Sequence, residues 1–149
     1  MTVPASGQFN HGVHHLPVRV YFEDTDLTGI VYHANYLRFM ERSRTEMLRA
    51  LGIEAQAMLD AGDGYYSVYE AHLNYLAPAR LDDVLTVRSC VVQVRAAATV
   101  IGQDIWRGAQ QLTRGRVTAA WLGMNGRPQR QPKDWAARFT ALQQEANPA

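Results

Sequence analysis

Three carboxylates fall within four residues near the start of the chain, and a histidine follows them where a helical pattern begins. The segment is YFEDTDLTGIVYHANY, residues 21–36, and it contains Glu23, Asp24, Asp26, Gly29 and His33. A helix N-terminus carries unpaired N–H groups and about half a positive charge, which would stabilise a developing oxyanion. A carboxylate a few residues earlier can face the same carbonyl group, as a nucleophile or as a general base for water. The pattern therefore indicates carbonyl chemistry.

Each of these residues also has a plainer interpretation. Asp26 could be an N-terminal cap or a solvated turn acid, while Glu23 and Asp24 are expected to orient the loop or face water. The imidazole of His33 could contact a substrate carbonyl or position water, or it could pack at the surface. The three acids could bind a hard cation, but they lack the regular ligand spacing of a calcium loop. We therefore predict no metal site and no cofactor.

The composition limits the classes of protein to which this chain can belong. Its 149 residues carry a formal net charge of +1, with 47% hydrophobic and 19% charged residues, which predicts one globular domain and no nucleic-acid surface. The single cysteine, Cys90, excludes an intramolecular disulfide. No apolar run is long enough for a membrane span, and the first residues lack a signal-peptide pattern. We expect a cytoplasmic protein.

The elements that must position these residues follow from hydrophobic spacing. Residues 17–23 are rich in β-branched and aromatic types and predict a strand. Residues 34–51 carry apolar side chains at helical spacing, and residues 53–62 predict a second, short helix. Four further strands are predicted within residues 65–78, 82–95, 98–106 and 112–123, and a closing helix within 132–146.

This order predicts an α+β fold in which a five-stranded antiparallel sheet wraps around one long helix. Residues 1–16 are small, polar and aperiodic, and we expect a flexible N-terminal arm there, followed by a single domain over residues 17–145. A free edge strand invites pairing with a second subunit, which favours a homodimer or homotetramer.

Two segments carry a resemblance to a known family. YFEDTDLTGIVYHANYLRFMERSRTEML, residues 21–48, resembles the opening of the hotdog-fold acyl-CoA thioesterases, and YLAPARLDDVLTV, residues 75–87, resembles their third-strand entry. The nearest likeness is to the YbgC-like branch, associated with the Tol–Pal envelope system, with the 4-hydroxybenzoyl-CoA thioesterases as more distant relatives. The resemblance implies a hotdog domain that hydrolyses an acyl thioester to an acid and a free thiol.

The resemblance also implies roles for particular residues. Asp26 matches the family's catalytic acid, and the backbone N–H of His33 matches the donor that polarises the thioester carbonyl. Gly29 and Ile30 occupy the loop that brings the backbone near the substrate.

Recognition of the thiol carrier is less well marked in the sequence. Where 4-hydroxybenzoyl relatives carry several cations, this chain has VRAAAT, which leaves only Arg95 for the phosphates of CoA. Phosphate contacts could come instead from Arg80, Arg114 or Arg116, or the thioester could be presented by an acyl carrier protein.

Two other functions are compatible with the same fold. One is hydration or dehydration of an acyl thioester, for which the offset between Asp26 and His33 is longer than usual. The other is a non-catalytic adapter that binds an acyl carrier or an envelope complex.

Overall fold

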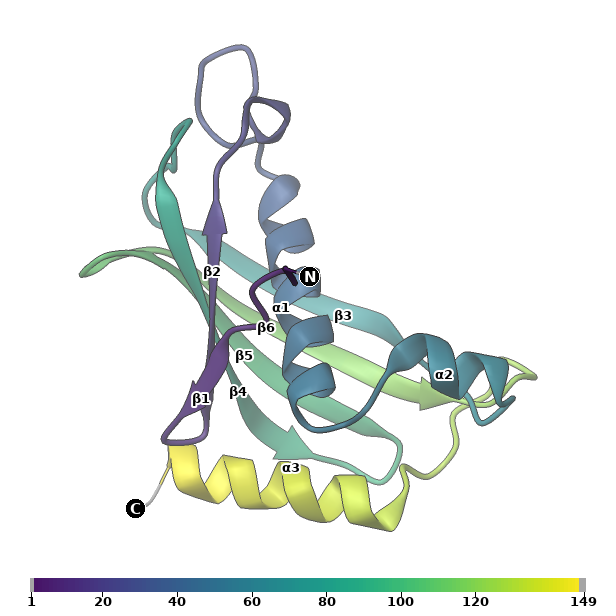
Figure 1. Ribbon diagram of the computed structural model, residues 1–149. Coiled ribbons are helices and arrows are strands. Elements are labelled where there is room, and N and C mark those ends of the chain that lie inside the picture. Colours follow the sequence, from purple (N-terminus) through teal and green to yellow (C-terminus); the bar gives the residue numbers. More distant parts are fainter. Residues whose placement is uncertain (1, 148–149) are drawn as a thin grey trace.

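A six-stranded antiparallel sheet curves around one long helix in the computed structural model, which describes residues 2–147 (Figure 1). The strands are β1 (Gln8–Asn10), β2 (Val13–Arg19), β3 (Tyr65–Tyr75), β4 (Val84–Val94), β5 (Ala98–Arg107) and β6 (Gln110–Leu122). They lie in the order β1-β2-β4-β5-β6-β3, and each neighbouring pair is antiparallel. The helices are α1 (Asn35–Ala50), α2 (Ala55–Asp60) and α3 (Lys133–Ala146), with a 3-10 turn, η1 (Phe22–Asp24). The α+β fold is confirmed.

Helix α1 is held against the concave face of the sheet by one apolar stripe. Phe39, Met40 and Met47 on this stripe have no exposed surface, and the first two belong to a core cluster with Leu85 and Ile105 of the sheet. Burying each such side chain stabilises the fold by about 1.5 to 3 kcal/mol. The helix spans residues 35–50, so the predicted helix is confirmed to within a residue at each end.

A second cluster fixes the other end of the sheet. Trp135 and Phe139 of α3 pack with Trp121, Val91 and Ile53. The predicted closing helix and short second helix are therefore present, and α3 lies along the sheet at the end away from the start of α1 (Figure 1). None of the helices in residues 2–147 has the length and hydrophobicity needed to span a membrane.

The prediction of a flexible arm over residues 1–16 is wrong for residues 8–16. These residues form β1 and the first half of β2, and β2 pairs with β4 in the sheet. His14 and Leu16 point into the core, and the Nε2 atom of His14 lies 2.9 Å from the Ser6 carbonyl oxygen. The sheet has six strands rather than the five predicted because β1 was not apparent from composition, and β2 spans Val13–Arg19 where the first strand was predicted at residues 17–23. Residue 1 of the predicted arm lies outside the described residues.

Candidate active site

The loop that precedes α1 is closed by its own backbone. Asp26 N–H donates to the Ile30 carbonyl at 2.8 Å, and Gly29 N–H donates to the Asp26 carbonyl at 3.0 Å. Gly29 has a φ of +82°, a conformation that glycine adopts without the strain a side chain would bring. Val31 N–H then donates to the Ala79 carbonyl at 2.8 Å, which ties the loop to the segment before β4. The loop therefore has a defined shape that presents Asp26 at one end of the molecule.

Asp24 anchors this loop to the first turn of α1. Its side chain is almost fully buried, and its two carboxylate oxygens accept different donors. Asn35 Nδ2 donates to Oδ1 at 2.9 Å, and Tyr21 N–H donates to Oδ2 at 2.8 Å. Its backbone carbonyl also accepts Tyr32 N–H at 2.9 Å. The expected loop-orienting role of Asp24 is confirmed, while Glu23 faces solvent.

Asp26 is oriented by Thr28 and keeps one carboxylate oxygen free. The Thr28 hydroxyl donates to Oδ1 at 2.6 Å, and Thr28 N–H donates to the same atom at 2.8 Å. Within residues 2–147, Oδ2 accepts no side-chain or backbone hydrogen bond. The two bonds from Thr28 lower the pKa of the Asp26 carboxyl, with smaller contributions in the same direction from the Ile30 backbone and from His33. The carboxylate is therefore ionised at neutral pH and fixed in orientation.

The start of α1 offers two backbone donors beside this loop. The Tyr32 carbonyl accepts Asn35 N–H at 2.8 Å, and the His33 carbonyl accepts the Tyr75 hydroxyl at 2.7 Å. No acceptor in the described chain receives the N–H of His33 or of Ala34. A hydrogen bond to the carbonyl of a peptide polarises the N–H of the same peptide, and the helix dipole adds positive potential at this end. Both N–H groups are thus suited to bind a developing negative charge.

The His33 ring lies over the surface between two tyrosines. Its centroid is 4.5 Å from that of Tyr32 and 6.4 Å from that of Tyr75. The exposed surface near this end of the chain is unusually apolar, because Phe22 is 82% exposed and Leu27 is fully exposed. An apolar ligand or a second subunit would shield such a surface from water. In residues 2–147 no three His, Cys, Asp or Glu side chains are grouped where they could hold a metal ion.

The structure brings four of the five predicted site residues together and separates the fifth. Asp26, Gly29 and Ile30 share one loop, and His33 follows where α1 begins. Arg95 lies elsewhere, where its Nη1 donates to the Tyr69 hydroxyl at 2.9 Å. Tyr69 is six residues along β3 from Tyr75, which contacts His33, so about 20 Å of strand separates the two regions.

Sequence reasoning missed Thr28 and Tyr75. Thr28 follows Asp26 by two residues, a spacing typical of an Asx turn, so its contact was detectable. Tyr75 approaches His33 across 42 residues of sequence, and no local pattern indicates that contact.

Comparison with known proteins agrees with this architecture. The model of the thioesterase superfamily matches residues 28–113. The acyl-CoA thioesterase YbgC of Haemophilus influenzae is 39% identical over 127 residues, which cover 85% of this chain and 93% of that protein. The acyl-CoA thioester hydrolase YbgC of Escherichia coli O157:H7 is 46% identical over 89 residues, 60% of this chain and 66% of that protein.

Solved structures show the same fold. A probable thioesterase from Bartonella henselae superposes with a TM-score of 0.77 at 33% identity, covering 80% of this chain and 99% of that one. A 4-hydroxybenzoyl-CoA thioesterase mutant complexed with 4-hydroxybenzoyl-CoA superposes with a TM-score of 0.74 at 21% identity, covering 87% of this chain and 97% of that one. The predicted family resemblance is therefore confirmed, and this chain belongs to the thioesterase superfamily and has its hotdog fold.

Proposed function

We propose that this chain is an acyl-CoA thioesterase whose reaction takes place between the Asp26 loop and the start of α1. The observation that carries the proposal is the pairing of an ionised carboxylate that has one free oxygen with two open backbone donors at the same end of the fold. Membership of the thioesterase superfamily, and likeness to proteins named acyl-CoA thioesterases, support the reaction class.

In this proposal the thioester carbonyl oxygen accepts the N–H of His33 at the positive end of α1. One such donor in a preorganised site is worth about 3 kcal/mol of barrier. Gly29 and Ile30 form the loop wall beside the scissile bond, and the absence of a side chain at Gly29 lets the substrate approach the backbone. The imidazole of His33 lies beside the same site and contributes positive potential when protonated.

Asp26 has two possible routes in this geometry. As a nucleophile, its free oxygen attacks the carbonyl carbon, the C–S bond breaks, and the thiolate departs. The product of this step is an acyl-aspartyl anhydride, which water then hydrolyses. As a general base, the same oxygen takes a proton from water while that water attacks the carbonyl carbon. Both routes release one carboxylic acid and one thiol.

The test is thiol release from a panel of acyl-CoA substrates by the wild type and the Asp26→Asn variant. We expect a loss of about 10³-fold or more, equivalent to about 4 kcal/mol of barrier. Glu23→Gln removes a neighbouring exposed acid and serves as the matched control, with expected activity near that of the wild type. Equal rates for Asp26→Asn and the wild type would contradict the proposal.

Further readouts of the same experiment separate the alternatives. After single turnover in ¹⁸O-labelled water, label in the Asp26 carboxylate marks the nucleophilic route with water attacking the aspartyl carbonyl of the anhydride, because the general-base route places label only in the product acid. Loss of enoyl absorbance without thiol release would indicate hydration, and binding without turnover would indicate an adapter.

We also propose that β3 pairs with a second copy of the chain. It is an 11-residue edge strand bonded only to β6, and its sequence contains no lysine or proline to discourage pairing. Tyr69 and Val68 on this strand are 58% and 44% exposed. Sedimentation equilibrium should give at least a dimer mass, and a monomer at micromolar concentration would contradict the pairing.

A further inference from the structure

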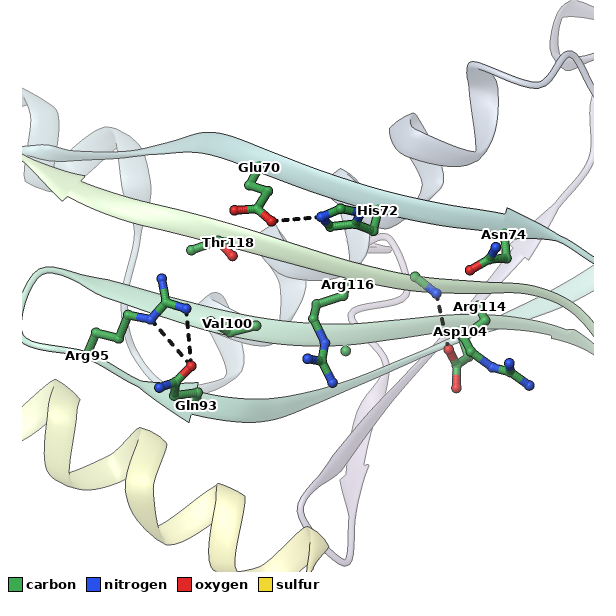
Figure 2. Close-up of a pocket in the computed structure, with 12 residues that line it drawn as sticks. Glu70, His72, Asn74, Gln93, Arg95, Val100, Asp104, Arg114, Arg116 and Thr118 are labelled. Carbon is green, nitrogen blue, oxygen red and sulfur yellow. Dashed lines mark hydrogen bonds and ion pairs between the residues drawn. The ribbon is translucent and has the colours of Figure 1, made fainter.

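Three arginines gather over the face of the sheet that α1 does not cover. A hollow of about 610 Å³ opens there, and we call it the outer-face hollow (Figure 2). Its polar lining includes Asn74 of β3, Gln93 of β4, Arg95, and Arg114, Arg116 and Thr118 of β6. A Cβ atom at Gly115 would lie 2.9 Å from Met40 of α1, so Gly115 faces the helix. Because side chains alternate along a strand, Arg114 and Arg116 project to the opposite face.

The floor of the outer-face hollow is open because the sheet carries a glycine there. Arg116 pairs in register with Gly102 of β5, so no side chain fills the position beside the arginine. A Cβ atom at Gly102 would lie 3.1 Å from Val92 and 3.4 Å from the Cys90 sulfur. The hollow is therefore part of how the strands are packed, and it leaves space next to Arg116 for a ligand.

The two acidic side chains that line the outer-face hollow, Glu70 and Asp104, form hydrogen bonds with groups other than the arginines. Glu70 binds His72 at 2.7 Å, and Asp104 accepts Gly115 N–H at 3.3 Å (Figure 2). In residues 2–147, neither Arg114 nor Arg116 lies within 4.0 Å of a carboxylate oxygen or donates a side-chain hydrogen bond. Asp104 lies close enough to Arg114 to interact through space, and it partly offsets that charge.

Arg95 adds a third guanidinium group from the wall opposite Arg114 and Arg116. Its guanidinium donates to Gln93 Oε1 and to the Tyr69 hydroxyl, both neutral groups, so its positive charge is held in place without being neutralised. The hollow thus contains three guanidinium groups, with acids that do not form ion pairs with them.

Guanidinium groups bind phosphate through two parallel hydrogen bonds. Arg114 and Arg116 are two residues apart on one face of β6, which places their Cα atoms about 7 Å apart. That spacing suits two phosphate groups better than one. We propose that the outer-face hollow binds a small molecule with at least two phosphate groups, held by Arg114 and Arg116 and, on the opposite wall, by Arg95.

Two sources could supply this chemistry. The phosphates could be those of a CoA substrate whose thioester lies beside His33. Arg114 pairs in register with Asn74, the residue before Tyr75, and Arg95 contacts Tyr69 about 20 Å further along β3, so the hollow extends along β3 from the end at which His33 lies. In that case the inference rests on the proposed function. They could instead belong to a free nucleotide that binds independently of the thioester.

The first experiment measures binding by isothermal titration calorimetry, with CoA, adenosine 3′,5′-bisphosphate and inorganic pyrophosphate as probes. Arg114→Gln/Arg116→Gln should weaken binding at least tenfold, because both side chains are exposed and their loss leaves the fold intact. Arg42→Gln/Arg127→Gln removes the same charge from other exposed sites and should change affinity by less than twofold. Absence of wild-type binding at millimolar concentration, or equal weakening by both double variants, would overturn the proposal.

The second experiment identifies the source of the phosphates. If they belong to the substrate, Arg114→Gln/Arg116→Gln raises KM for acyl-CoA at least tenfold and leaves the kinetics of the matching acyl-pantetheine unchanged. If they belong to a free nucleotide, kinetics on both substrates stay unchanged while nucleotide binding is lost. The calorimetric measurement needs no turnover. A failure of phosphate binding at the outer-face hollow is therefore distinguishable from a failure of the proposed thioesterase activity.

Discussion

Replacing Asp24 by Asn tests whether the buried acid holds the Asp26 loop on α1. The substitution keeps the shape of the side chain but changes one carboxylate oxygen to an NH₂ group. Whichever way the new amide is oriented, one of the two existing donors, Asn35 Nδ2 or Tyr21 N–H, then faces another donor. The remaining bond is made to a neutral oxygen instead of a charged one.

The expected cost follows from these two contacts. A hydrogen bond to a charged group contributes about 2 kcal/mol, and a neutral one contributes about 1 kcal/mol. Losing one charged bond and weakening the other therefore lowers the free energy of unfolding by about 3 kcal/mol. Asp24 is only 4% exposed, so water cannot replace the lost partners.

The assay is urea unfolding, combined with thioester hydrolysis where the variant is fully folded. A loss of about 3 kcal/mol should lower the urea midpoint by about 1 to 2 M for a protein of this size. Hydrolysis should also fall, because Tyr21 and Asn35 no longer fix the loop against α1. Glu23→Gln, on the neighbouring exposed acid, should stay within about 0.5 kcal/mol of the wild type. If the Asp24 and Glu23 variants unfold at the same midpoint, Asp24 does not anchor the loop.

Three further changes probe the same end of the fold. Thr28→Val removes a hydroxyl that lowers the pKa of Asp26, so the acid limb of the kcat/KM profile should move to higher pH; an unmoved limb would contradict the assigned contact. Tyr75→Phe removes the hydrogen bond to the His33 carbonyl, which polarises the N–H of Ala34, the second open donor, and should lower kcat about fivefold, equivalent to about 1 kcal/mol, with thermal unfolding as the control; an unchanged kcat would show that this bond does not support the Ala34 donor. At Gly29 an added Cβ atom would have no neighbour within 4 Å, but the backbone φ is +82°, which a side chain strains. Gly29→Ala should therefore lower the free energy of unfolding by about 1 kcal/mol. A urea midpoint equal to that of the wild type would contradict the backbone argument.

Helix α1 and the four long strands could be predicted because their signals are local. The apolar stripe of α1 repeats every three to four residues, and each long strand is a β-rich run bounded by turn residues. The same locality explains why Asp26, Gly29, Ile30 and His33 could be grouped in advance, since they fall within eight residues of one another.

The features that were missed depend on contacts across the sequence. Residues 8–16 look like a loose terminus by composition, and only pairing with β4 makes them a strand. Arg114 and Arg116 line the same hollow as Arg95 because β6 lies beside β5, and β5 beside β4, in the sheet. No periodicity within one segment predicts which faces of three strands carry charge together.

The crowding of acids before α1 is explained by the separate environment of each carboxylate. Asp24 is buried on donors from Asn35 and Tyr21, Asp26 is held by Thr28 with one oxygen free, and Glu23 faces water. Two of the three charges are thus stabilised by donors that the folded loop itself supplies, so their mutual repulsion does not open the loop. A charged group whose donors are already in place needs little rearrangement when a substrate arrives, which is the condition under which electrostatic stabilisation lowers a barrier most. Asp24, buried on its own donors, therefore helps to fix the loop that carries Asp26.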